Sequence, residues 1–140
     1  MIRRILVAVD GSDNSRKAAR FARELAGALR AHVTLLHVIE PPTSLPLEAY
    51  GLTRTQVYEG QLEAAAAVLS ALAAEIPAGQ VDQVIESGSP AETICAQAEE
   101  RNVDLVVLGS RGMGAVGRWL LGSVSDRVVH LSRRPVTVVR

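Results

Sequence analysis

Five short hydrophobic segments alternate along the chain with stretches of helical periodicity. Most of these segments are near-continuous runs of Val, Ile and Leu, a pattern typical of strands buried on both faces. They are Ile5 to Val9, Val33 to Ile39, Val81 to Ile85, Leu105 to Leu108 and Val136 to Val139. Because strands that alternate with helices form a parallel sheet covered on both sides, the pattern predicts an α/β fold.

The segments between the strands predict four helices, each with apolar residues at helical spacing or a start signal. Two of them begin with capping signals. Ser89 precedes Pro90 at a first helical position, and Ser123 opens a Ser-x-x-Asp variant of the capping box with Asp126 in place of Glu. The predicted helices are Ser15 to Leu29, Leu62 to Ile76, Pro90 to Arg101 and Ser123 to Ser132.

One long stretch, Glu40 to Thr55, lacks periodicity and contains three prolines. It follows the second predicted strand, so we expect a mobile flap or an entry to the second helix. No repeat or linker interrupts the chain, and we expect one domain over residues 1–140.

Composition narrows the classes of function. The chain is 48% apolar with a formal net charge of zero, which argues against nucleic-acid or membrane-surface partners because both require a basic excess. The one cysteine, Cys95, excludes an internal disulfide and fits an inert packed thiol in a reducing compartment. No apolar stretch approaches the length of a membrane span, and no signal region precedes the first strand. We therefore expect a cytoplasmic protein.

The stretch from Gly109 to Ser125 carries the clearest chemistry. A hydrophobic strand ends in glycines there, and a Ser-capped helix starts at Gly122-Ser123. This arrangement places free backbone N–H groups and the positive end of a helix at one spot, which is an anion site and most often a phosphate site.

Two common phosphate motifs do not fit this loop. Gly112 to Gly117 matches the dinucleotide pattern G-x-G-x-x-G, but that motif belongs after the first strand and needs an acid about 20 residues later, where this chain has Thr137. The Walker motif needs a lysine, and no lysine follows Lys17. Arg111 and Arg118 could supply positive charge instead.

A third pattern, G-x2-G-x9-G-[ST], matches Gly109, Gly112, Gly122 and Ser123 without a gap. It is the signature of the ATP-binding subgroup of the universal stress protein family, which this chain resembles over essentially its whole length. The opening Ile5-Leu-Val-Ala-Val-Asp-Gly-Ser12, the segment Leu35-Leu-His-Val-Ile39 and the ending Arg134-Pro-Val-Thr-Val-Val139 also resemble the family.

The resemblance implies a Rossmann-like or flavodoxin-like parallel sheet of five strands in the order 3-2-1-4-5, with helices on both faces. Ligands bind such sheets at the carboxyl ends of strands where the order reverses. Asp10 and Gly109 end the two strands that are neighbours at that reversal. A carboxylate and a phosphate loop would then face one crevice.

The family also implies roles for single residues. The three glycines would let the backbone approach phosphate oxygens, and the Ser123 and Ser125 hydroxyls would donate to the phosphates beside the N–H groups of Ser123 and Val124. Asp10 would accept hydrogen bonds from the ribose, and Val38 would offer its backbone to adenine. The implied binding residues are Ala8, Val9, Asp10, Val38, Gly109, Arg111, Gly112, Gly122, Ser123, Val124 and Ser125.

Structural roles compete with some of these assignments. Asp10 can also cap the first helix, as can Ser12 or Asp13, and Ser123 is a plausible N-cap in its own right. His37 lies in a buried strand and is better interpreted as a satisfied core histidine than as a base. His32 and His130 have no partner at metal-ligand spacing, so we expect no structural metal, although Mg²⁺ would accompany a bound triphosphate.

The favoured function is an ATP-binding regulatory protein with no catalytic residue and little or no turnover. One alternative is an adenylate-forming enzyme, but those enzymes carry S-G-G-x-D-S where this chain has Asp10-Gly-Ser-Asp-Asn-Ser15. The other alternative is a ligand-free assembly or chaperone module. The family implies a homodimer through the last strand, Pro135 to Arg140, whose apolar edge would otherwise stay unpaired.

Overall fold

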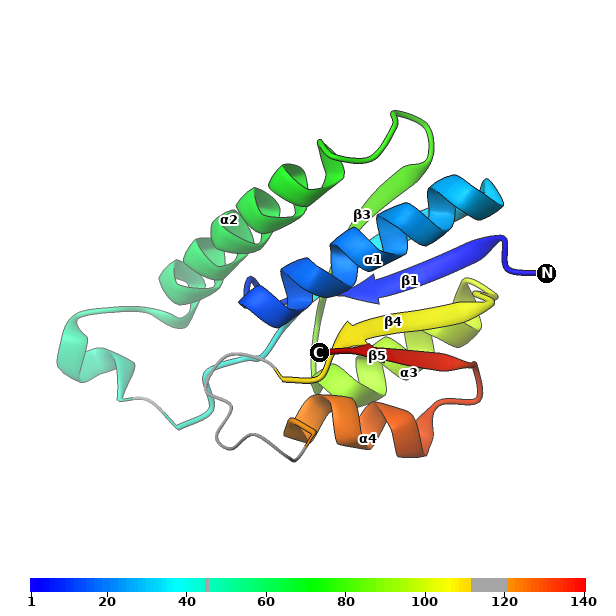
Figure 1. The fold of residues 1–140 in the computed structure, drawn as a ribbon. Helices are drawn as coiled ribbons and strands as arrows, with labels where there is room; N and C mark the ends of the chain where they lie inside the picture. The colour runs from blue at the N-terminus through cyan, green and yellow to red at the C-terminus, as the bar shows by residue number, and fades with distance from the viewer. Residues whose placement is uncertain (45, 112–120) are drawn as a thin grey trace.

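The computed structural model describes residues 1–44, 46–111 and 121–140. Five strands form one sheet in the order β3-β2-β1-β4-β5, and every neighbouring pair is parallel. The predicted fold class and strand order are therefore confirmed (Figure 1). The strands are β1 (Arg4–Ala8), β2 (His32–Ile39), β3 (Val81–Ser87), β4 (Leu105–Gly109) and β5 (Val136–Val139).

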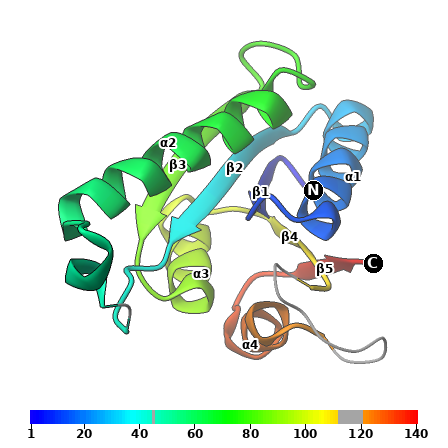
Figure 2. The same ribbon diagram turned by 90° about the vertical axis from the view of Figure 1, so that its left-hand side faces the viewer.

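The helices cover the sheet in two pairs, α1 with α2 and α3 with α4, and Figure 2 shows the two pairs on opposite sides of the sheet. One pair packs on one face and the other pair on the opposite face, because the chain runs outward from β1 to β3 and then crosses back to β4 and β5. The first pair is α1 (Asp13–Leu29) and α2 (Arg54–Ala73), and the second is α3 (Pro90–Glu100) and α4 (Ser123–Leu131).

Alternate strand residues supply the two hydrophobic cores. On β1, Ile5 and Val7 pack against α1 and α2, whereas Leu6 packs against α3 and α4. The α1 side is rich in alanine, which brings that helix close to the sheet. Cys95 packs at the edge of the α3–α4 core, where burial raises the pKa of its thiol.

Helix α2 begins earlier than the predicted Leu62. Thr53 accepts a hydrogen bond from the Gln56 N–H at 3.1 Å, and the Gln56 side chain accepts from the Thr53 N–H at 2.9 Å. This reciprocal pair is a capping box that starts the helix at Arg54. The expected flap before it contains a short 3-10 helix, η1 (Leu47–Tyr50), anchored by the buried Leu47.

The predicted caps are partly wrong. Ser12 caps α1 by accepting from the Ser15 N–H at 3.2 Å, so Ser12 takes the cap that Asp10 and Asp13 could also have made. At α4 the N-cap is Gly122, with Ser123 as the first helical residue and not the cap. Pro90 does begin α3, although Ser89 caps it without a side-chain bond to the backbone.

Within the described ranges, no helix combines the length and the apolar character that crossing a membrane requires.

Candidate functional site

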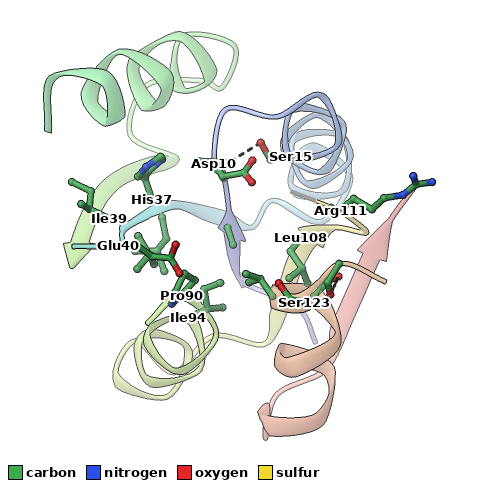
Figure 3. A pocket seen from close by; sticks show the side chains of 18 of the residues that line it. Asp10, Ser15, His37, Ile39, Glu40, Pro90, Ile94, Leu108, Arg111 and Ser123 are labelled. Carbon is green, nitrogen blue, oxygen red and sulfur yellow. Dashed lines mark hydrogen bonds between the residues drawn. The ribbon is translucent and has the colours of Figure 1, made fainter. Parts of the chain in front are cut away.

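A cavity of about 570 Å³ opens at the carboxyl ends of β1, β2 and β4. Because the chain leaves β1 for one side of the sheet and β4 for the other, the cavity lies where the strand order reverses. Figure 3 shows Asp10, His37, Leu108 and Ser123 arranged around it from different elements.

The turn after β1 is held by its own hydrogen bonds. Asp10 Oδ1 accepts from the Ser12 N–H at 2.9 Å, and the Asp10 N–H donates to Ser15 Oγ at 3.3 Å. Gly11, with φ +85°, lies in the left-handed region that favours glycine. The Asp10 carboxylate therefore both stabilises the turn and lines the cavity.

The end of β4 is packed tightly against α1. A Cβ on Gly109 would lie 2.8 Å from the carbonyl carbon of Asn14 and 2.9 Å from its Cβ. Gly109 lines the cavity as expected, but the group that requires a glycine there is the α1 backbone.

Ser110 ties β4 to the start of α4. Its carbonyl accepts from the Gly122 N–H at 2.7 Å and from Ser125 Oγ at 2.8 Å. Its own N–H donates to the Val139 carbonyl at 2.7 Å. These bonds fix the position of the α4 N-terminus relative to the sheet.

The first turn of α4 faces the cavity. Ser123, Val124 and Ser125 all line it, and their N–H groups precede Asp126, whose N–H makes the first helical bond, to the Gly122 carbonyl. Within the described part of the chain, no side chain caps this turn. The first three N–H groups of α4 therefore belong to residues that line the cavity, and the positive end of the helix lies beside it.

Ser125 differs from the role that the family implies. Its hydroxyl is buried and donates to the Ser110 carbonyl, with the Gly122 carbonyl 3.0 Å away. The single hydroxyl proton thus has a protein acceptor here. Ser125 supports the site by holding Ser110 and α4 together.

The end of β2 projects beyond β1. The Leu36 carbonyl accepts from the Val9 N–H at 2.9 Å, so Leu36 directs its backbone toward β1. In a parallel strand, every second residue directs its backbone N–H and C=O toward the same neighbouring strand. Val38 therefore directs these groups to the β1 side, as Leu36 does. Ala8, which pairs with Leu36, is the last residue of β1, so Val38 lies beyond the end of that strand. This places a backbone donor and acceptor beside the cavity, which Val38 lines.

His37 is not the satisfied core histidine that the sequence predicted. It is partly exposed and lines the cavity, and its buried Nδ1 has no hydrogen-bond partner among the described residues. Burial lowers the pKa of its ring, and this effect exceeds the opposing ones of the Asp10 charge and a hydrogen bond to the Val9 backbone. The imidazole is therefore neutral at pH 7.

All the predicted binding residues in the described ranges line this one cavity. Gly112 lies outside those ranges. Arg111 lines the cavity as well, but Figure 3 shows its side chain extending away from Asp10 and Ser123.

Sequence reasoning missed several lining residues, among them Glu40 and Gln61. Gln61 was missed because α2 was predicted to start one residue after it. A capping signal at Thr53-x-x-Gln56 would have extended the helix and placed Gln61 on its buried face, one turn before Ala65. In the described residues, no group of three or more His, Cys, Asp or Glu side chains could hold a metal ion.

The chain is a doubly wound α/β protein. Its cavity lies at the switch point of the sheet, where such folds bind their ligands, and is lined by a helix N-terminus and a strand-end carboxylate. The model of the universal stress protein family matches residues 1–140, and the chain belongs to this family.

Individual proteins agree with this assignment. A universal stress protein of Thermus aquaticus, from the 3′ region of the QAH/OAS sulfhydrylase, is 36% identical over 140 residues and covers 100% of both chains. The structure of UspA from Lactobacillus plantarum is 28% identical with a TM-score of 0.77, over 99% of this chain and 98% of that one.

Two further structures of the same fold contain nucleotides. One is the universal stress protein from Archaeoglobus fulgidus in complex with dAMP, with a TM-score of 0.69, 24% identity and full coverage of both chains. The other is a universal stress protein in complex with cAMP, with a TM-score of 0.71 and 24% identity over 99% of this chain and 97% of that one. At these identities they show that the fold is shared.

Proposed function

We propose that the protein binds ATP, accompanied by Mg²⁺, in the cavity at the carboxyl edge of the sheet. The first turn of α4 is the observation that carries the proposal. Its first three residues line the 570 Å³ cavity, and no side chain of the described residues caps their N–H groups. A helix start of this kind stabilises a bound phosphate.

The remaining parts of a nucleotide find matching groups across the cavity. Asp10 lies in the middle, where a ribose hydroxyl could donate to its carboxylate. Val38 offers a backbone donor and acceptor at the end of β2, between apolar walls that include Pro90 and Ile94. The cAMP and dAMP complexes show that relatives with this fold hold an adenine nucleotide.

A regulatory role fits this site better than turnover. The Asp10 carboxylate already accepts a hydrogen bond from the Ser12 N–H through Oδ1 and holds the turn after β1. Several charge-assisted hydrogen bonds to a triphosphate would support a Kd on the order of micromolar after the costs of association. The protein would then respond to ATP by holding it.

Incubation with ATP labelled at the α-phosphate tests this function. We expect the protein to retain intact ATP through rapid gel filtration. Release of AMP and pyrophosphate would instead indicate the adenylate-forming class, and no retention would indicate a module without a nucleotide.

The substitution Ser123→Asp tests the location of the phosphates. A carboxylate in the first turn of α4 favours the helix by about 0.3–1 kcal/mol, because it complements the dipole. The same charge repels a phosphate at that turn, so the Kd for ATP should rise at least tenfold while the melting temperature holds or rises.

The matched control is Ser123→Asn, which has a similar shape without the charge and should weaken ATP binding far less. Equal affinity of the Asp and Asn variants for ATP would place the phosphates elsewhere.

A further inference from the structure

The strand β3 forms one edge of the sheet, at the end opposite to β5 (Figure 2). Just before this strand, the Gln80 carbonyl accepts a hydrogen bond from the Val33 N–H of β2 at 2.8 Å. Just after it, the Gly88 N–H donates to the Ile39 carbonyl of β2 at 3.0 Å. Because every second residue of a parallel strand faces the same neighbour, the even-numbered residues of β3 pair with β2. The odd-numbered residues therefore direct their backbone N–H and C=O groups outward.

This outer edge of β3 is accessible to another chain. Gln83 and Ser87 are exposed, and Val81 and Ile85 are half-buried. Within the described part of the chain, no strand pairs with this side of β3, and no side chain hydrogen-bonds to the backbone of Gln83 or Ile85. A row of unpaired backbone groups is a template for a further strand.

A groove of about 710 Å³ lies beside this edge, between β3 and the second half of α2. Its α2 side is lined by the small residues Ser70, Ala73 and Ala74, and its β3 side by Val81 and Gln83. Gln83 Oε1 accepts from Ser70 Oγ at 3.4 Å, so the odd-numbered side chains of β3 lie on the α2 side of the sheet. A strand added to β3 would place every second side chain over this groove, where the small residues leave room for apolar groups.

The opposite face of β3 is acidic. Asp82 and Glu86 flank Val84, which packs on the α3–α4 side of the sheet. The Asp82 carboxylate pairs with His32 at 2.9 Å, whereas Glu86 has no ion-pair partner among the residues that the structure describes. The surrounding sequence adds to this charge, because residues 40–90 include seven acidic residues and one basic residue. The other side chains of an added strand would therefore meet carboxylates.

These carboxylates disfavour a second copy of β3 as the occupant of this edge. Antiparallel pairing of two copies about a twofold axis normal to the sheet would bring Asp82 and Glu86 of both chains together on one face. Like charges opposite one another on neighbouring strands are destabilising, whereas opposite charges are stabilising. The edge strand β5, by contrast, has no charged residue between Val136 and Val139.

We propose that the outer edge of β3 binds an extended segment of another protein in which basic residues alternate with apolar ones. The backbone of the segment pairs with Gln83 and Ile85, its apolar side chains lie in the groove beside α2, and its basic side chains lie beside Asp82 and Glu86. In this mode of recognition, main-chain hydrogen bonds supply affinity and alternate side chains supply specificity. The groove shares no lining residue with the nucleotide cavity, so the inference does not depend on the proposed function.

The test uses the acetylated and amidated peptide Lys-Val-Lys-Val-Lys-Val-Lys, with Glu-Val-Glu-Val-Glu-Val-Glu as its charge-reversed control. In titrations followed by NMR, the wild type should bind the lysine peptide at least tenfold more tightly than the glutamate peptide. In the complex, the amide protons of Gln83 and Ile85 should exchange with solvent at least tenfold more slowly. The amide of Val84, which faces β2, should change little.

Gln83→Pro tests the strand pairing, because proline removes the outward N–H while the bonds of the neighbouring residues to β2 remain. It should weaken binding of the lysine peptide at least tenfold. Gln83→Ala is the matched control, since it also loses the bond to Ser70, and its affinity should stay within twofold of the wild type. Glu86→Gln should weaken the lysine peptide roughly two- to fivefold by removing one opposite charge.

Equal affinity for the two peptides would overturn the inference, as would no binding of the lysine peptide at millimolar concentration. Binding without slower exchange at Gln83 and Ile85 would also overturn it, and this measurement on the wild type holds even if Gln83→Pro fails to fold. A smaller oligomer of Gln83→Pro in light scattering would show that a second copy occupies the edge, and would overturn the inference as well. None of these outcomes bears on ATP binding.

Discussion

Gly109 lies where the backbone of α1 meets the end of β4. An alanine there would bring its Cβ to 2.8 Å from the Asn14 carbonyl carbon, and a backbone atom cannot swing aside as a flexible side chain can. Gly109→Ala should therefore lower the free energy of unfolding by about 1–3 kcal/mol, the usual cost of overpacking. Urea unfolding followed by circular dichroism measures this loss.

Gly27 is the matched control for that substitution. It lies in α1 on an exposed face, with open space within 4 Å of where a Cβ would be. Gly27→Ala should stabilise the protein by about 0.5–1 kcal/mol, because alanine loses less conformational freedom in a helix. Equal stability of the two variants would show that α1 does not require the glycine of β4.

His37 gives the stability of the protein a defined dependence on pH. Its native pKa lies below 6.5, mainly because of burial, so the unfolded chain takes up a proton first as the pH falls. The free energy of unfolding should thus decrease as the pH falls below about 6.5.

His37→Phe removes this titration while keeping a planar ring. The loss of stability between pH 7.5 and 5.5 should be smaller in the variant than in the wild type, because the variant lacks the ring whose protonation is disfavoured in the folded state. An identical loss in the two proteins would contradict the assignment to His37.

For single residues, the sequence predicted which ones line a common site but not what each side chain contacts. Asp10, Val38 and Ser123 line one cavity, as the family resemblance implied. That Asn14 requires the glycine at position 109 depends on a packing distance between segments about a hundred residues apart. The motif alone does not contain that distance.

At the scale of the element, Thr53 determines where α2 begins. Its hydroxyl accepts from the Gln56 N–H at 3.1 Å and satisfies one of the helix's free donors. Thr53→Ala should cost about 1 kcal/mol of stability. Thr55 is the second residue of the helix and makes no cap. Thr55→Ala should therefore cost nothing, since alanine favours the helical state. Thermal unfolding of the two variants compares them directly, and matching melting temperatures would argue against the cap.

Strands were predicted more accurately than helix starts. The apolar runs of β1, β4 and β5 match the observed bounds to within a residue, because burial on both faces leaves an unbroken hydrophobic signal. Residues 54–61 of α2 are mostly exposed, so apolar spacing gave no sign of them. The sequence feature that marks the start of this segment is the capping box of Thr53 and Gln56, which an analysis of hydrophobic periodicity does not detect.

For the whole molecule, β5 is an edge strand. Pro135 and Val139 accept hydrogen bonds from Val106 and Ser110 on its β4 side. The alternate residues Val136 and Val138 therefore direct their backbone groups away from the sheet. An apolar edge of this kind is a template for pairing with another strand, and we propose a homodimer formed there.

Two variants test the dimer by light scattering. Truncation after Arg134 should give monomers, and so should Val136→Pro, which blocks the outer edge while keeping the strand's bonds to β4. The second variant covers the case in which loss of β5 impairs folding. A dimer that survives both changes would refute pairing through this edge.

The strand order shows the limit of pattern reasoning for the whole molecule. Alternating strands and helices predict a parallel α/β sheet, but several strand orders share that pattern. The order β3-β2-β1-β4-β5 was implied by the resemblance to the universal stress protein family, and it makes neighbours of the strands that lead to Asp10 and Gly109.

Calorimetric titration of the wild-type protein with ATP and Mg²⁺ tests the central claim most directly. The geometry of α4, Asp10 and Val38 predicts saturable binding at one site per chain, with a Kd on the order of micromolar. Measurement at two temperatures guards against a binding enthalpy that happens to be zero. Flat titrations at both temperatures would contradict the account of this cavity as a nucleotide site.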